Sequence, residues 1–96
     1  IFVKDFMTIY IPNAFTPNTD RVNKVWYVYG TLVKEIVIYV FDRWGQKVFE
    51  SHDLEQGWDG TYEGKLCPID TYVYKVEAHD FFNEKHRFVG HVNLIR

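Results

Sequence analysis

The chain has 96 residues, which is enough for one domain and too few for two. Aromatic residues make up 19% of it, while Ala and Leu number 2 and 4; this balance excludes an all-helical bundle, because helices favour Ala and unbranched side chains. A net charge of −2 beside 47% apolar residues excludes disorder and offers no basic excess for a nucleic-acid backbone, so no nucleic-acid partner is expected.

Targeting segments and disulfides are not predicted. No apolar run approaches the roughly 20 residues of a transmembrane helix. The first seven residues include Lys4 and Asp5, so they lack the uninterrupted apolar stretch of a signal peptide. Cys67 is the single cysteine, which excludes an internal disulfide and a multi-cysteine metal site.

Short strands and loops are predicted along the first half of the chain. Residues 3–11 alternate loosely between apolar and polar side chains and are expected to form a strand. Residues 12–23 contain two Pro, three Asn and one Asp, which is typical of a structured loop. Residues 25–29 are predicted as a short strand, and residues 31–34 as one helical turn at most. Residues 35–42 are apolar on both faces, so they are expected in the middle of a sheet.

The second half continues this pattern. Residues 43–46 are predicted as a tight turn whose glycine can adopt a positive φ, and residues 47–51 return as a strand. Residues 57–64 contain the turn signals Asp-Gly and Glu-Gly. Residues 71–79 alternate as a half-exposed strand does, and residues 86–95 form the last strand. About seven short antiparallel strands at this spacing predict an all-β fold, an Ig-like or fibronectin-like β-sandwich.

Metal ligation is not expected from the histidines or from the opening loop. The four histidines are interpreted as solvated or edge residues, because His86 and His91 would point to opposite faces of a regular strand. Asn18 and Asp20 are the weak candidates for a calcium site. One carboxylate is few for a hard dication and Arg21 adds positive charge, so an Asx-type loop bonded to backbone amides is favoured.

The sequence lacks a catalytic constellation. Ser51 is the only serine, and it has no flanking glycines of a nucleophile elbow. Cys67 precedes Pro68 in a predicted turn, where nothing marks an activating base. The sequence therefore predicts a domain that is not an enzyme and that has no cofactor and no small-molecule substrate.

Some of the aromatic residues could instead stack on sugar rings, as in a carbohydrate-binding module. The candidates are Trp26, Trp44, Trp58, Tyr72 and Tyr74. Core packing is the competing interpretation, because sandwich interiors accept large rings. Tyr72 and Tyr74 share a strand face with apolar residues, which favours core packing for both. Trp44 lies in a turn, where it either caps the end of the sandwich or stands exposed.

Five short blocks carry a family resemblance. They are Ile-Pro-Asn-Ala-Phe-Thr-Pro-Asn at 11–18, Asp-Arg-Trp-Gly-Gln-Lys-Val-Phe-Glu-Ser at 42–51, Trp-Asp-Gly-Thr-Tyr-Glu-Gly-Lys at 58–65, Pro68 with Thr-Tyr-Val-Tyr at 71–74, and Gly-His-Val-Asn-Leu-Ile-Arg at 90–96. In this order the chain resembles, from end to end, the gliding-motility-associated C-terminal domain of Bacteroidota. That domain is the type B sorting domain of the type IX secretion system.

The resemblance implies which residues form the sorting motif. They are Pro12, Asn13, Phe15, Pro17, Asn18, Asp20, Arg43, Trp44, Gly45, Trp58, Asp59, Gly60, Gly64, Tyr72, Tyr74, Gly90, Leu94 and Arg96. The opening loop departs from the family pattern: Thr19 and Arg21 replace two glycines, and Lys24 replaces an aspartate that could ligate calcium. Asp70 stands where the family prefers glycine.

The resemblance also implies a passenger-handling role. Residues 1–96 would be a single, non-catalytic C-terminal sorting domain that directs a larger passenger protein through the type IX secretion system. The passenger would cross the periplasm and reach the cell surface or the outside. The implied partners are the type IX machinery and an outer-membrane protein of the gliding-motility type, and the isolated domain is expected to be monomeric.

We expect recognition to use a folded surface, because the blocks are spread over the whole chain. The hypothesis places residues 12–23 and the turn at 43–45 near one end of the sandwich, with the final strand offering an edge to a partner strand. Two alternatives remain open. A glycan-binding module predicts an exposed row of two or three aromatics and binding lost in Trp44→Ala. A plain Ig-like spacer of a surface adhesin predicts that grafting the chain onto a reporter leaves export unchanged.

Overall fold

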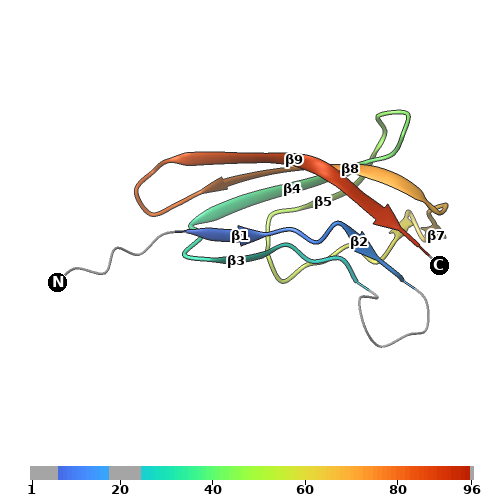
Figure 1. Cartoon of the computed structure of the whole chain (residues 1–96), viewed down its shortest axis with the longest axis horizontal. Helices are drawn as coiled ribbons and strands as arrows, with labels where there is room; N and C mark the ends of the chain where they lie inside the picture. Colours follow the sequence, from blue (N-terminus) through green and yellow to red (C-terminus); the bar gives the residue numbers. More distant parts are fainter. Residues whose placement is uncertain (1–6, 18–24, 96) are drawn as a thin grey trace.

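The computed structural model describes residues 7–17 and 25–95, which form strands joined by turns and loops (Figure 1). The strands are β1 (Thr8–Tyr10), β2 (Ala14–Phe15), β3 (Tyr29–Thr31), β4 (Glu35–Phe41), β5 (Lys47–Ser51), β6 (Thr61–Tyr62), β7 (Lys65–Leu66), β8 (Asp70–His79) and β9 (Lys85–Leu94). Within these described residues, no helix is long and apolar enough to cross a membrane.

A five-stranded sheet with the strand order β2-β9-β8-β4-β5 forms one layer. Its four longer strands pair antiparallel. Along β4, Ile36, Ile38 and Val40 are buried and alternate with partly exposed residues, as expected for a strand with one face on the core. The short strand β2 pairs in parallel with the end of β9, with Ala14 opposite Asn93.

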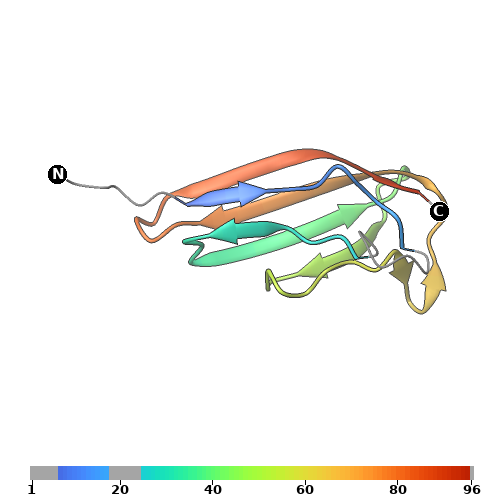
Figure 2. The same cartoon turned by 60° about the horizontal axis from the view of Figure 1, so that its bottom comes forward.

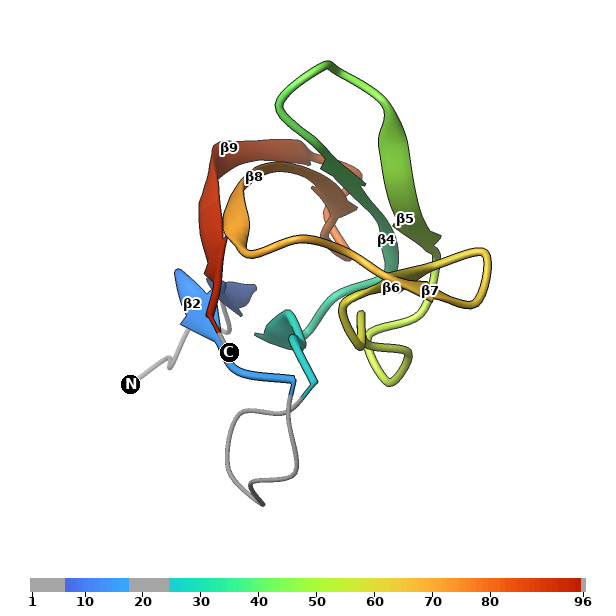
Figure 3. The same cartoon turned by 90° about the vertical axis from the view of Figure 1, so that its right-hand side faces the viewer.

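The second layer lies across the core from this sheet and is built from shorter pieces (Figures 2 and 3). β1 and β3 pair antiparallel; Ile9 packs against the core, whereas Thr8 and Tyr10 are exposed. An isolated β-bridge extends the layer, in which the Trp26 amide donates to the Trp58 carbonyl at 2.8 Å and the Trp58 amide donates back at 2.9 Å. The β6–β7 hairpin follows this bridge in the chain.

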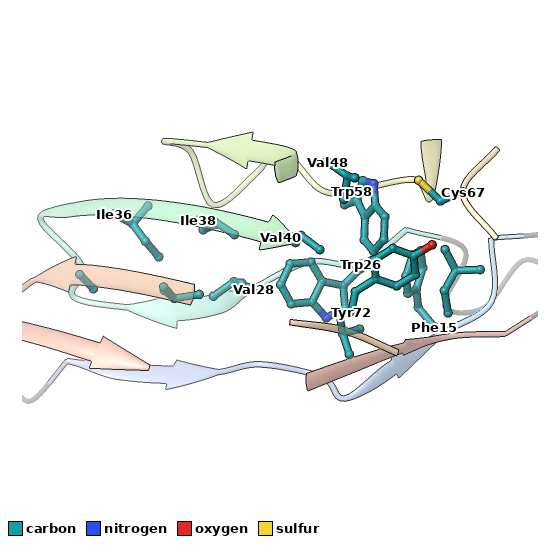
Figure 4. Packing of buried hydrophobic residues seen from close by; sticks show 14 residues of the cluster. Phe15, Trp26, Val28, Ile36, Ile38, Val40, Val48, Trp58, Cys67 and Tyr72 are labelled. Atoms are coloured by element: carbon teal, nitrogen blue, oxygen red, sulfur yellow. The ribbon is translucent and has the colours of Figure 1, made fainter. Parts of the chain in front are cut away.

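Large aromatic rings fill the core at one end of the sandwich, and aliphatic side chains of β4 fill the other (Figure 4). The Trp58 ring centroid lies 5.2 Å from that of Phe15 and 5.1 Å from that of Tyr72, the latter in an edge-to-face arrangement. Trp26 packs against Tyr74, with ring centroids 5.8 Å apart. Such tilted contacts are the favoured geometry for aromatic pairs, and each ring buries roughly 150 to 250 Å² of surface.

The polar tips of these buried rings are all satisfied by nearby backbone carbonyls. Trp26 Nε1 donates to the carbonyl of Pro12 at 2.8 Å, and Trp58 Nε1 donates to that of Thr61 at 3.1 Å. The Tyr72 hydroxyl donates to the Pro68 carbonyl at 2.6 Å. Because an unpaired buried donor costs about 1 to 3 kcal/mol, these bonds allow the two tryptophans and the tyrosine to be buried without that cost.

The predicted all-β sandwich is confirmed, although the structure has nine strands where about seven were expected. The prediction that all strands are antiparallel is wrong, because β2 runs parallel to β9. Residues 12–23 were expected to be loop throughout, yet they contain β2. The loop forms a strand there because its partner is supplied by the far end of the chain, which a local pattern does not reveal.

Two smaller boundaries also differ from the prediction. The strand expected at 25–29 begins only at Tyr29, and the preceding residues contribute the isolated bridge of Trp26. Residues 31–34 form no helical turn, because Leu32 adopts a φ of 57° and the backbone turns directly into β4. The strand expected at 3–11 is β1, and residues 3–6 lie outside the described residues.

Candidate functional site

A hollow of about 500 Å³ is lined by residues that follow the end of β4 and residues that precede β8. The end of β4, the start of β8 and the end of β9 lie toward the same end of the molecule (Figures 1 and 3). Three segments far apart in sequence surround the hollow: the β4–β5 turn, the β6–β7 hairpin and the stretch leading into β8. We call it the end hollow. Three of the five sequence blocks contribute residues to its lining: the block at 42–51, the block at 58–65 and the block that begins with Pro68.

The β4–β5 turn is held by the side chain of Asp42. Its Oδ1 accepts hydrogen bonds from the amides of Trp44 at 2.9 Å and Gln46 at 2.8 Å. Gly45 adopts a φ of 83°, the left-handed region that glycine enters without steric cost. The predicted turn is thus confirmed, and its backbone directs Trp44 outward, where 78% of the residue is exposed.

Arg43 is fixed by two neighbours at the mouth of the end hollow. Its Nε lies 2.9 Å from Asp70 Oδ2 and its Nη2 lies 3.4 Å from Asp70 Oδ1, so the pair is bidentate. The guanidinium also sits 5.4 Å from the centroid of the Trp44 ring. Asp70 is therefore not a neutral replacement for the glycine that the family prefers, because it orients Arg43.

Apolar side chains form an exposed rim around this ion pair. Leu66 and Ile69 are 70% and 61% exposed, and with Trp44 they line the same hollow. Sequence reasoning missed Leu66 and Ile69, since an apolar residue beside a turn carries no signal of its own exposure. Exposed apolar side chains grouped beside charged ones are typical of a protein interaction site.

Most of the other motif residues that the structure describes are structural. Phe15, Trp58, Tyr72 and Leu94 are buried in the core, and Pro12 contributes its carbonyl to Trp26. These residues hold the end of the sandwich together, and the four buried side chains have almost no exposed surface to offer a partner.

Three sequence blocks meet at Gly60. The residue is buried with a φ of 84°, and a Cβ placed there would lie 2.8 Å from Pro17 Cγ and 3.4 Å from Leu94 Cδ1. Beside it, Asp59 accepts hydrogen bonds from the amide and the hydroxyl of Thr61 at 3.1 and 2.6 Å. The Trp-Asp-Gly block therefore forms a turn that packs against Pro17 of the first block and Leu94 of the last block.

The remaining motif residues lie elsewhere on the sheet and its turns. The Asn13 side chain is exposed while its carbonyl accepts the Asn93 amide at 2.8 Å. Gly64 adopts a φ of 81° in the β6–β7 turn. Tyr74 and Gly90 are register partners on β8 and β9.

Three predicted positions fall outside the part of the chain that the structure describes. They are Asn18 and Asp20, the weak calcium candidates, and the terminal Arg96.

Core packing, and not sugar stacking, is confirmed for three of the five aromatic residues that were considered for both. Trp26, Trp58 and Tyr72 are buried, and Tyr74 is half-buried against Trp26. Only Trp44 of that set is exposed. The large rings lie inside because a small sandwich needs their volume between its two layers.

The free edge that was proposed for the final strand does not lie beside the end hollow. β2 covers the last residues of β9, where the Ile95 amide donates to the Phe15 carbonyl at 3.0 Å. The β4–β5 turn and β2 do lie toward the same end, as expected (Figures 1 and 3). Among the strands described, none pairs with the outer side of β9 before Asn93, so its open edge lies toward the opposite end of the molecule.

A cluster of titratable groups closes the β8–β9 hairpin at that opposite end. Ligand atoms of Asp80, Glu84 and His86 all lie within 4.8 Å of one another. The Asp80 carboxylate accepts from the amides of Phe82 at 2.8 Å and Glu84 at 3.0 Å, and lies 3.0 Å from His86 Nε2. The bond to His86 and then the backbone bonds lower the pKa of Asp80 below its usual value. These contacts give the carboxylate a turn-closing role.

Comparison with known families completes the description of the site. No curated protein and no solved structure matches the chain. One family model, described as the CHU_C type IX secretion signal domain, matches residues 9–94. The match runs from β1 to the end of β9 and so includes every strand of the end hollow. The resemblance drawn from the five blocks is confirmed, and the chain belongs to the family of type IX secretion signal domains, which mark proteins for export to the cell surface or outside.

Proposed function

We propose that the chain is the C-terminal sorting domain of a larger passenger protein and that residues 1–96 form this single domain. The passenger would cross the periplasm and leave the cell through the type IX secretion system. The family match over residues 9–94 is the observation that carries this proposal. The domain would act by being recognised, without catalysis, a cofactor or a small-molecule substrate.

We further propose that the end hollow is the surface that the secretion machinery recognises. Its support is the combination of a fixed ion pair, Arg43 with Asp70, and an exposed apolar rim that includes Trp44. Trp and Arg are the residue types that most often dominate binding energy at protein interfaces. Because the hollow exists only when three distant segments meet, an unfolded passenger tail would not present it.

The partner in this proposal is an outer-membrane protein of the gliding-motility type, acting with the type IX machinery. The domain itself would be monomeric. A rim of apolar side chains around an ion pair suits a partner that covers Trp44 with apolar surface and offers hydrogen bonds to Arg43 and Asp70, since a charge pair removed from water must keep its polar atoms satisfied.

Export of a grafted reporter tests the proposal. Residues 1–96 are fused to the C-terminus of a periplasmic reporter in a host with type IX machinery, and the reporter is assayed in periplasmic, surface and medium fractions. We expect the fusion to reach the surface or medium. Trp44→Ala should hold the reporter in the periplasm, because it removes the most exposed apolar side chain of the rim.

The control is Val89→Ala, which removes an exposed apolar side chain of β9 that does not line the end hollow. It should be exported like the unmodified fusion, and thermal unfolding should show that both variants fold. Reporter left in the periplasm by the unmodified domain would favour the spacer alternative. Normal export of Trp44→Ala would keep the sorting role and reject the end hollow as the recognition surface.

A further inference from the structure

A row of tyrosines lies on the outer face of the β1–β3 layer, away from the end hollow. Tyr10 and Tyr29 are register partners, with ring centroids 6.0 Å apart and planes inclined by only 28°. They are 64% and 53% exposed. Tyr27 continues the row, with its centroid 6.2 Å from that of Tyr29. Two exposed rings and a half-buried third therefore lie next to one another on this face.

Strand stability alone does not account for this row. Cross-strand aromatic pairs stabilise a sheet by roughly 0.2 to 1 kcal/mol, but threonine pairs serve the same purpose. The neighbouring register pair on this face is such a case, since the hydroxyls of Thr8 and Thr31 are hydrogen-bonded to each other. Tyrosine leaves more apolar surface exposed than threonine does, and adjacent exposed apolar side chains often mark a binding surface.

The row lies between two shallow hollows. One, of about 620 Å³, is lined by Tyr10, Asn13 and Tyr29 among others. The second, of about 450 Å³, is lined by Tyr27, Tyr29 and Glu55 among others. Tyr29 lines both, so the two hollows flank one ring, and we call the tyrosine row with these two hollows the tyrosine track. A row of adjacent rings suits an extended chain of repeated units better than a small compact molecule.

The residues that line the two hollows indicate the chemistry of the extended ligand. Among the described residues that line the two hollows, Glu55 alone is charged, so an anionic polymer would be repelled and not held. Tyrosine hydroxyls and the Asn13 amide both donate and accept hydrogen bonds, while the tyrosine rings offer flat apolar faces. A pyranose has the matching combination of an apolar C–H face and a rim of hydroxyl groups.

We propose that this tyrosine track binds a neutral polysaccharide, with sugar rings stacked on Tyr10, Tyr29 and Tyr27. The site is independent of the end hollow and of the sorting role. It also differs from the buried tryptophans first considered for sugar stacking, since its rings come from β1, β3 and the residues just before β3. Its consequence would be that an exported domain holds its passenger against neutral glycan.

Affinity electrophoresis of the purified chain tests the proposal. Native gels contain one polymer each: laminarin, xyloglucan or hydroxyethyl cellulose as neutral probes, and alginate as the anionic probe. We expect retardation by at least one neutral probe and none by alginate. Tyr29→Ala should weaken that retardation about tenfold, whereas Tyr29→Phe should retain most of it, because stacking needs the ring more than the hydroxyl.

One control and one second variant keep the outcome decisive. The control, Trp44→Ala, removes the exposed tryptophan of the end hollow and should leave retardation unchanged. The second variant, Tyr10→Ala, should show the same loss as Tyr29→Ala and replaces it if Tyr29→Ala proves unstable in thermal unfolding. The proposal is overturned if no neutral probe retards the chain, or if both alanine variants fold and are retarded normally. It is also overturned if sedimentation shows a dimer that Tyr29→Ala dissociates, since the row would then be an interface between two copies.

Discussion

The ring of Tyr74 lies over Gly90, its register partner on the neighbouring strand, so closely that a Cβ at Gly90 would be 2.5 Å from Tyr74 Oη and 2.7 Å from Tyr74 Cζ. Both residues are among those that the family resemblance implies for the sorting motif. On the other side, the Tyr74 ring packs against Trp26, so it has little room to move. Glycine is therefore required at this position because the Tyr74 ring occupies the space that a side chain would fill. Aromatic rings cover glycines on adjacent strands of β-sheets in the same way.

Gly90→Ala should destabilise the domain by about 1 to 3 kcal/mol, because the added methyl group overpacks the space under the Tyr74 ring. Chemical denaturation of the variant measures the loss. In a Tyr74→Val background the same change should cost much less, since the ring is gone. Equal costs in both backgrounds would show that the glycine is needed for its backbone and not for the ring.

Trp58→Ala should destabilise the domain by about 3 to 5 kcal/mol, the usual range for removing a large buried aromatic side chain. Trp58 contacts Phe15 and Tyr72 and donates to the Thr61 carbonyl, so both packing and a hydrogen bond are lost. The matched control is Trp44→Ala at the exposed turn, which should change the free energy of unfolding by no more than about 0.5 kcal/mol. Similar losses for the two tryptophans in denaturant titrations would contradict the assignment of Trp58 to the core.

Glu63→Asn should stabilise the domain by roughly 0.5 to 1 kcal/mol. Glu63 and Gly64 have φ values of 53° and 81°, and asparagine enters the left-handed region more easily than glutamate. Asn83 already fills such a position, at a φ of 64°. Gly64→Ala is the opposing control and should lower the melting temperature. A Glu63→Asn melting temperature at or below that of the parent would argue against strain in this turn.

Asp80 should make stability depend on acid pH. The pKa of its carboxyl is lowered in the folded state by the bond to His86 and by backbone amides, so the ionised form stabilises the fold above the unfolded-state pKa of about 3.9. This contribution is lost as the pH falls through the folded-state pKa. Asp80→Asn should therefore lower the melting temperature at pH 7, and the difference from the parent should shrink at pH 2 to 3. A difference that is the same at both pH values would rule out the charged form as its source.

The sequence by itself determined the fold class and the faces of the long strands. Val76 and Ala78 of β8 are buried as the alternation of residues 71–79 predicts, because side chains of a strand point to opposite faces whatever the rest of the fold does. The apolar run at 35–42 forms β4, which lies between β8 and β5 inside the sheet as predicted. The turn at Gly45 is local in the same sense, since its φ and the Asp42 bonds involve residues within four positions. The five blocks were sufficient to identify the family for the same reason, because each block consists of residues close together in the sequence.

Only the tertiary structure decided which of the aromatic residues are buried and which are exposed. Trp26 and Trp44 are equally apolar in sequence, yet one is held between the layers by a backbone bridge to Trp58 and the other projects from a turn. Likewise, the parallel pairing of β2 with β9 joins segments from opposite ends of the chain. Such contacts depend on where distant segments meet, and the loop-closure entropy that they overcome leaves no periodic trace in the local sequence.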